Sequence, residues 1–402
     1  MNIAKNYSIK KYRKFFISKF RFGHFIVLLI FIMLHNPTAA LSSVNNEDQI
    51  KEAAIKLVEF CVEPKTGLDE NAVATLINHV LSPKQNKGHS LPKSMNSTGA
   101  YYEFDTKINF PLFIEYSYHP FIPPVITRPS SLRYSIWTSN KKDYKKLPVA
   151  WKYIPPGGKP LIINGIQDES DTPDLNTGVY HEYSLKRTLV LLNYKGKQVM
   201  VSISKQISKS NVGKKGIILN NDNGWNYYYS GEPGTTRAGL GWAKSYIYDF
   251  FSVGLYVESG TSSAMVRTGI FQWLRAGWSG INFVKSNHII EGLKRFARDC
   301  KTSLESPLLP PPDRIISVYE LLSNMPEDDL LKQYTILQQE QQSAAIKINK
   351  ISQSDSDEKM SFANTSKEQM IQEFMLEYLK MIFGKPTLVG KNLLNSIDNI
   401  LR

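Results

Sequence analysis

Cysteines, histidines and long apolar runs are all scarce in this sequence of 402 residues. Two cysteines cannot build the disulfide framework of a small secreted scaffold, and seven dispersed histidines do not form a zinc motif. The longest apolar run, Phe25 to Leu34, is about half of the ~20 residues that a membrane-spanning helix needs. Because 42% of the residues are apolar, the chain also does not belong to the disordered class. The length therefore predicts a globular protein of about two or three domains.

The first forty residues have the organisation of a secretory signal peptide. They carry seven basic side chains and no acidic one, then the apolar run, and then small residues that end in Ala39 and Ala40. We predict cleavage between Ala40 and Leu41, which makes the mature protein periplasmic or otherwise exported. The alternative is an uncleaved segment that anchors the chain in the inner membrane.

Basic charge is concentrated in the middle of the chain. The formal net charge is +13, of which residues 1–40 contribute +7, residues 121–300 contribute +12, and residues 41–120 and 301–402 contribute −3 each. Two lysine clusters make up much of the central excess: Lys141, Lys142, Lys145, Lys146 and Lys152, and Lys195, Lys197, Lys205, Lys209, Lys214 and Lys215. In an exported protein they predict binding to an anionic envelope polymer, lipid head groups or carbohydrate rather than nucleic acid. The alternative is that they are solvated edge lysines that prevent sheet-to-sheet pairing.

The period of the apolar residues changes twice along the chain and predicts an α+β fold with an antiparallel sandwich or partly closed barrel in its centre. The predicted order is a signal peptide (1–40), a helical pair and linker (41–99), an antiparallel β-domain (100–260), helices that pack on it (261–306), and a Pro-rich spacer with a C-terminal helical region (307–402) that contains a mobile linker (352–366). Membrane contact is expected only through the signal peptide during export, and the C-terminal helices are a candidate surface for a protein partner.

Individual elements follow from shorter patterns. Asp69 is the predicted N-cap of a helix over 69–81, and Gly196 lies in the turn of a hairpin that pairs 184–193 with 198–206. A second hairpin pairs 216–219 with 225–229. Further strands are predicted at 101–110, 133–138, 148–153, 160–166 and 246–257, and further helices at 47–63, 266–281, 313–323, 326–351, 367–383 and 386–401.

The two cysteines each end an amphipathic helix. Cys61 lies on the apolar stripe of the first helix of the mature chain, and Cys300 on that of the last helix before the Pro-rich spacer. Export permits a disulfide between them, because that compartment is oxidising. Two separate buried thiols are the equally weighted alternative.

Motifs for catalysis and for metal binding are weak. There is no G-x-S-x-G elbow, and the S-x-x-K at Ser202–Lys205 lies inside a predicted strand, where that chemistry does not work. The acidic residues Asp168, Asp171 and Asp174 are weak candidates for a calcium site, although a solvated acidic loop is favoured. We predict no cofactor.

Aromatic residues and glycines gather between Gly224 and Trp242. The residues in this stretch that would contact a ligand are Trp225, Tyr227, Tyr228, Tyr229, Arg237 and Trp242. They predict either a stacking platform for sugar rings or an aromatic core with glycines at its corners, and the core is favoured.

Together these features predict an exported, non-catalytic envelope protein that binds an anionic or carbohydrate component, or a protein partner. An envelope-polymer or peptide hydrolase is the first alternative, with Glu232, Asp249 and Glu258 as the candidate carboxylates. An effector that acts after full secretion is the second.

Overall fold

The structure is a computed structural model, and it describes residues 37–83, 87–139, 153–237, 241–260, 264–348 and 365–389. Within these ranges the side chains of 37–45, 235–237 and 241–242 are not described. The chain divides into two compact units, Met1–Asp48 and Gln49–Arg402. Most of the predicted strand at 148–153, of the predicted helix at 386–401 and of the 352–366 linker lies outside the described residues, as do the lysines from 141 to 152.

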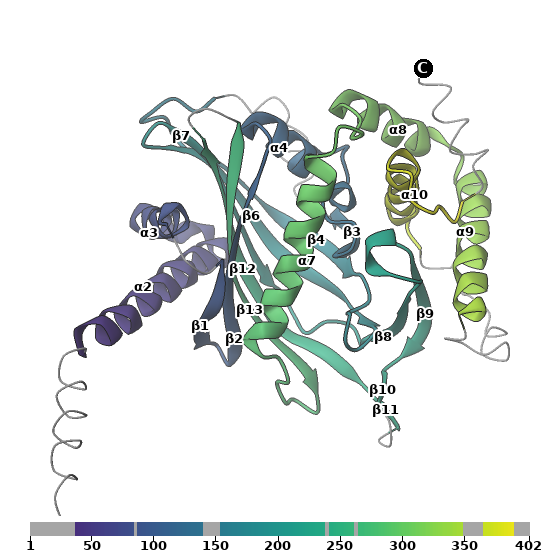
Figure 1. Cartoon of the computed structure of the whole chain (residues 1–402), viewed down its shortest axis with the longest axis horizontal. Coiled ribbons are helices and arrows are strands. Elements are labelled where there is room, and N and C mark those ends of the chain that lie inside the picture. The colour runs from purple at the N-terminus through teal and green to yellow at the C-terminus, as the bar shows by residue number, and fades with distance from the viewer. Residues whose placement is uncertain are drawn as a thin grey trace, which may run out of the picture. The chain divides into compact units, whose positions relative to one another are not determined.

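One antiparallel sheet of eight strands organises the second unit (Figure 1). Its spatial order is β1 (Gly88–Ser94), β2 (Ser97–Thr106), β13 (Met265–Trp278), β12 (Ser245–Ser259), β7 (Lys197–Gln206), β6 (Glu182–Tyr194), β4 (Leu161–Asp171) and β3 (Leu132–Trp137). The predicted α+β class with antiparallel strands is confirmed, and the sheet is open, with β1 and β3 at its two edges. The predicted hairpin is β6–β7, with Asn193 opposite Gln198.

Two predicted elements are wrong in kind. Residues 266–281 were predicted to be helical, but β13 occupies most of this stretch and pairs with both β12 and β2. Val266, Ile270 and Leu274 are four residues apart, and an even spacing suits one face of a strand as well as a helical stripe. The other face carries Phe271 and Trp273, so β13 has apolar residues on both faces.

Residues 88–94 were predicted to belong to a linker, but they form the edge strand β1. The composition of this segment is rich in Pro, Lys and Ser, which is common in edge strands because one side of the backbone needs no partner. Met95 and Asn96 make the turn into β2 with positive φ angles of 48° and 60°.

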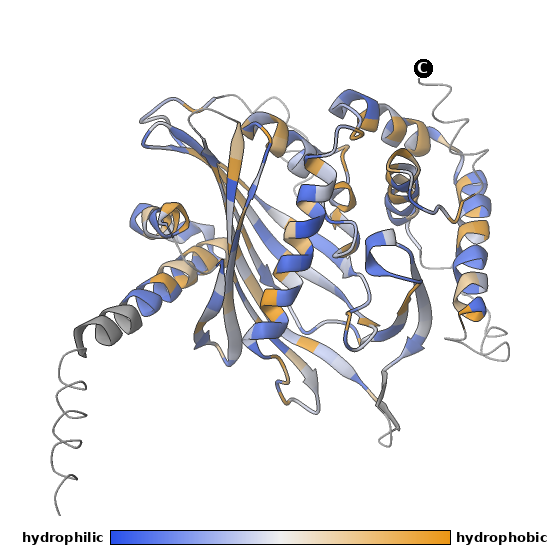
Figure 2. Ribbon diagram, in the orientation of Figure 1, coloured by the Kyte–Doolittle hydropathy of each residue, from blue (hydrophilic) through white to orange (hydrophobic). Residues whose placement is uncertain are grey.

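Helices cover both faces of the sheet, and their amphipathic character is visible in Figure 2. From Gln49 onward, α2 (Pro37–Val62) packs with α3 (Glu70–Leu81) on one face, which we call the α3 face. The Asp69 side chain caps α3 by accepting a hydrogen bond from the Ala72 amide at 2.8 Å, as predicted. On the opposite face, which we call the α7 face, lies α7 (Ser286–Leu304), with Leu293 and Phe296 packed against Ile270.

The two cysteines are buried on opposite faces of the sheet and are not bonded. The Cys61 thiol contacts the Ile203 carbonyl on the α3 face, and the Cys300 thiol contacts the Thr127 carbonyl on the α7 side. The sheet therefore separates them, and the disulfide alternative is wrong in this structure. Burial raises the pKa of both thiols, which keeps them protonated.

Three C-terminal helices pack together near β3 (Figure 1). They are α8 (Pro312–Asn324), α9 (Glu327–Lys347) and α10 (Lys367–Ile382), and every residue of α10 from Gln369 to Lys380 is buried. A short helix, α4 (Phe110–Tyr118), and the turn η2 (Pro124–Ile126) lie between β2 and β3 along the chain. None of the helices in the described ranges is both long and apolar enough to cross a membrane.

The smaller β-structure contains the aromatic stretch. β5 (Val179–Tyr180), β8 (Lys214–Ile218) and β9 (Tyr227–Pro233) form a three-stranded sheet, while β10 (Thr235–Arg237) pairs with β11 (Gly241–Ala243). The predicted second hairpin is confirmed, because Ile217 lies opposite Tyr228.

Candidate functional site

A cavity of about 290 Å³ lies between α7 and the α7 face of the sheet. Strands β4, β6, β7, β12 and β13 form its floor, α7 forms its roof, and the segment before β3 closes one side. We call it the α7 cavity. Figure 1 shows α7 running across this face of the sheet.

Polar side chains line the floor because the strands alternate strictly. Ser202 and Ser204 of β7 and Ser252 of β12 face the cavity, and Ser204 and Ser252 are hydrogen-bonded at 2.8 Å. Ile203 and Val253 point to the opposite face, into the core beneath α2 and α3. A face of small hydroxyl groups covered by a helix leaves room for a ligand and offers it hydrogen bonds.

A buried ion pair lies in the floor of the α7 cavity. Arg187 on β6 donates to the Glu169 carboxylate on β4 at 2.9 Å, and its other nitrogens donate to Gln167 at 2.8 Å and to Ser202 at 3.2 Å. Glu169 also accepts from the Ser135 hydroxyl at 3.0 Å. Both charged groups are therefore held in place by the protein itself.

Arg128 is the exception among the charged groups of the α7 cavity. Within the described residues its guanidinium has no hydrogen bond and no ion pair, and it lies 5.2 Å from the centre of the Phe296 ring. Burial alone would lower the pKa of Arg128, but neighbouring groups, Tyr256 foremost, raise it above its ordinary value. The side chain is thus a permanent cation that lines the cavity without a bound counter-charge.

Three other charged residues line the α7 cavity, and each has a partner. Arg295 of α7 donates to both carboxylate oxygens of Asp222. Burial acts to raise the pKa of Asp222, but Arg295 outweighs it, and the pKa lies below its ordinary value. Asp171 accepts from the His181 amide, and Asp174 accepts from the Thr177 amide at 2.8 Å.

The predicted aromatic platform is mostly buried core. Trp225, Tyr227 and Tyr228 are at most 6% exposed, and Tyr229 is half-buried with Arg133 stacked 4.0 Å from its ring centre. These rings pack against the C-terminal helices and cannot present a stacking surface to solvent. The side chains of Arg237 and Trp242 lie outside the described residues.

The acidic run proposed for calcium is not a loop over its first half. Residues 168–171 end strand β4, so Asp168 and Asp171 point to opposite faces of the sheet, and Asp168 accepts from Ser184 at 2.6 Å. In the part of the chain that the structure describes, no three His, Cys, Asp or Glu side chains are placed to hold a metal ion.

The three carboxylates predicted as candidates for hydrolysis do not lie together. Asp249 is paired with Lys205, Glu232 is paired with Lys215 at 3.6 Å, and Glu258 accepts from a strand amide at 3.1 Å. Asp249 and Glu258 lie nine residues apart on β12, a separation of about 30 Å. None of them lines a cavity described here, so the hydrolase hypothesis fails for these residues.

Half of the second lysine cluster is paired with carboxylates. Besides Lys205 and Lys215, Lys214 is paired with Glu182 at 3.1 Å, and Lys209 lies 4.0 Å from the ring centre of Tyr246. These contacts do not leave a continuous basic surface for a polyanion. The edge-lysine alternative is also wrong for Lys197, Lys205, Lys214 and Lys215, because β7 and β8 are each flanked by two strands.

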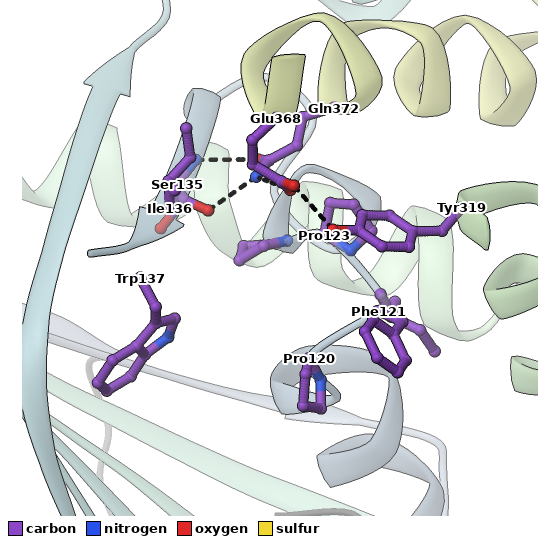
Figure 3. Close-up of a pocket in the computed structure, with 11 residues that line it drawn as sticks. Pro120, Phe121, Pro123, Ser135, Ile136, Trp137, Tyr319, Glu368 and Gln372 are labelled. Carbon is purple, nitrogen blue, oxygen red and sulfur yellow. Dashed lines mark hydrogen bonds between the residues drawn. The ribbon is translucent and has the colours of Figure 1, made fainter. Parts of the chain in front are cut away.

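A second pocket, of about 220 Å³, lies between β3 and helices α8 and α10 (Figure 3). Prolines and aromatic rings form its walls, and we call it the β3 pocket. A much smaller cavity, of about 20 Å³, shares Arg128 with the α7 cavity and Trp137 with the β3 pocket. Of the α7 cavity, sequence patterns singled out only Asp171 and Asp174 as candidate ligand-binding residues, and for a different ligand. They singled out no residue of the β3 pocket, because each site joins segments that are far apart in the chain.

No family model matches the sequence, and no curated protein matches it. Among solved structures, the human StarD13 (DLC2) lipid transfer and protein localization domain aligns with 60% of this chain and 99% of that domain. The sequence identity is 8% and the TM-score is 0.29. A TM-score of 0.29 does not support any inference about function. The function is therefore inferred from the geometry of the chain itself.

Proposed function

We propose that this protein is a non-catalytic binding module that holds a small amphipathic anion in the α7 cavity. The observation that carries the proposal is Arg128, a half-buried cation without a counter-charge among the described residues, in a cavity whose other charges are paired. A cation that is partly removed from water without a counter-charge loses hydration free energy, and an anionic ligand would offset that loss. The anionic envelope component expected from the sequence would thus bind at Arg128 rather than at surface lysines.

The rest of the lining supports a ligand with an apolar part. Ile270, Leu293, Phe250 and Phe296 contribute apolar surface next to Arg128. The carboxylates Asp171 and Asp174, which would repel an anion, are occupied by backbone amides. Burial also raises the pKa of Asp171 above its ordinary value.

Octanoate should bind the mature protein, and 1-octanol should bind at least about tenfold more weakly, because only the carboxylate can pair with Arg128. Isothermal titration calorimetry of the wild type and of Arg128→Met measures this difference. The variant should lose at least about tenfold in octanoate affinity and leave 1-octanol affinity unchanged.

Lys294→Met is the matched control, because Lys294 is an exposed cation on α7 that is paired only with Glu291. It should bind octanoate like the wild type. Equal octanoate affinity in Arg128→Met and wild type would show that Arg128 is not the anion site, and the absence of binding by both probes would refute the binding module itself.

We also propose that the chain is exported to the cell envelope and processed. Full-length protein made in a bacterium should be recovered from the envelope fraction with Leu41 as its first residue, as determined by N-terminal sequencing. Ala40→Phe should block processing, because signal peptidases require a small residue before the cut. Recovery of envelope protein that still begins at Met1 would instead support the uncleaved anchor.

A further inference from the structure

The β3 pocket is a second site that the proposed function does not use, and it shares no lining residue with the α7 cavity. Its lining comes from the segment that leads into η2, from the end of the edge strand β3, from one residue of α8 and from two residues of α10. These parts come from four regions of the chain, namely residues 120–124, 135–137, 319 and 368–372.

Aromatic rings and prolines form the walls of the β3 pocket. Phe121 and Tyr319 lie side by side with ring centres 5.6 Å apart. Trp137 lies across the pocket from Phe121 and Pro120, as Figure 3 shows. The electron-rich faces of such rings attract cations, and a tryptophan attracts them most strongly.

Among the residues that the structure describes, Glu368 is the only charged one that lines the β3 pocket. Its carboxylate accepts a hydrogen bond from the Tyr319 hydroxyl at 2.7 Å and from the Gln372 amide at 3.1 Å (Figure 3). Gln372 is in turn tied to the backbone of Ser135, accepting from its amide and donating to its carbonyl, both at 2.9 Å. The carboxylate is therefore held in a defined position, and among the described residues no cation is paired with it.

The surroundings of the β3 pocket do not compensate this negative charge. His119, behind Phe121, accepts a hydrogen bond from the Phe121 amide at 3.2 Å through Nδ1. Burial lowers the pKa of His119, so the imidazole is neutral at physiological pH. Lys367, the neighbour of Glu368, donates to the Met325 carbonyl at 2.9 Å instead.

We propose that the β3 pocket binds an organic ammonium group, of which a trimethylammonium head is the best-fitting example. A quaternary ammonium has no N–H to donate, so aromatic faces and one fixed carboxylate suit it better than a hydrogen-bonding site does. Three aromatic side chains, three prolines and one carboxylate meet this requirement. The proposal is independent of the α7 cavity and of its anion.

The test compares choline with 3,3-dimethyl-1-butanol, which has the same shape but carries carbon in place of the charged nitrogen. Calorimetry on the mature protein should show choline binding at least about tenfold more tightly, the factor expected from cation–π and carboxylate attraction together. Glu368→Gln should reduce choline affinity towards that of the neutral alcohol. Phe121→Leu, which keeps an apolar wall but removes one ring face, should weaken choline binding and leave the alcohol unaffected.

Glu320→Gln is the matched control, because it removes an exposed carboxylate on α8 next to Tyr319 without touching the pocket. It should leave choline affinity unchanged, and thermal melting should show that all variants are folded. Equal affinity for choline and the neutral alcohol, or the absence of binding by choline, would overturn the proposal. So would unchanged choline affinity in both Glu368→Gln and Phe121→Leu.

Discussion

Replacing Glu373 by leucine should lower the free energy of unfolding by about 3–5 kcal/mol, the usual cost of removing one partner of a buried ion pair. Glu373 lies on α10, is 5% exposed, and accepts from Arg133 Nε on β3 at 2.8 Å. Its carboxylate also accepts from the Tyr334 hydroxyl at 2.9 Å and from Gln338 and Gln369 at 3.2 Å each. Without Glu373, the Arg133 charge stays buried without an opposite charge, and the ion pair that joins α10 to β3 is lost.

Urea unfolding of three variants separates the contribution of the Glu373 charge to stability from the contribution of its packing. Glu373→Gln keeps an acceptor and should be less destabilised than Glu373→Leu. The double variant Arg133→Met/Glu373→Leu should recover part of the loss, because neither charge remains. If the free energy of unfolding of Glu373→Leu were within about 1 kcal/mol of the wild-type value, the ion pair would not be what holds α10 on the sheet.

Replacing Trp273 by alanine should lower the free energy of unfolding by a similar amount, about 3–5 kcal/mol, for a different reason. Trp273 is fully buried on the α3 face, with its ring stacked on Phe251 at a centre distance of 5.2 Å. Its indole nitrogen donates to the Pro92 carbonyl of β1 at 3.0 Å, and Gly99 of β2 leaves the space that the ring edge occupies. The substitution would open a large cavity and release the edge strand β1.

Trp278→Ala is the control for this prediction, since Trp278 lies at the end of the same strand, is only partly buried, and stacks on Phe283. This substitution should lower the free energy of unfolding clearly less than Trp273→Ala does, because a partly exposed side chain leaves a smaller cavity. Equal losses in the two variants by chemical denaturation would contradict the central packing role assigned to Trp273.

Local patterns predicted the elements whose partners are close in sequence. The β6–β7 hairpin was predicted because its turn at Gly196 and its alternation lie within about two dozen residues. The helix α3 was predicted for the same reason, with Asp69 as its cap. β13 was assigned wrongly because its even apolar spacing is compatible with both periods, and its pairing with β12 on one side and with β2, about 160 residues earlier, on the other makes it a strand.

The candidate sites were harder to predict than the fold. Arg128 lies in an irregular segment with no motif, and its isolation becomes apparent only when Phe296 and the sheet enclose it. Glu368 was one acidic residue among many at the start of a helix, where it also favours the helix dipole. One usable signal existed, namely the serines that alternate with Ile203 and Val253 in strands buried on both faces.

By itself, the sequence determined the α+β class, most helices and hairpins, the concentration of basic charge, and the expectation of export. These depend on composition and on periods of two to four residues, which any short segment contains. The tertiary structure alone decided that the cysteines lie on opposite faces, that Trp225 and Tyr227 are core, and that two cavities each hold one charge that no opposite charge among the described residues pairs with. Such facts depend on distances between remote segments, and these are set by how the sheet and helices pack rather than by any local pattern.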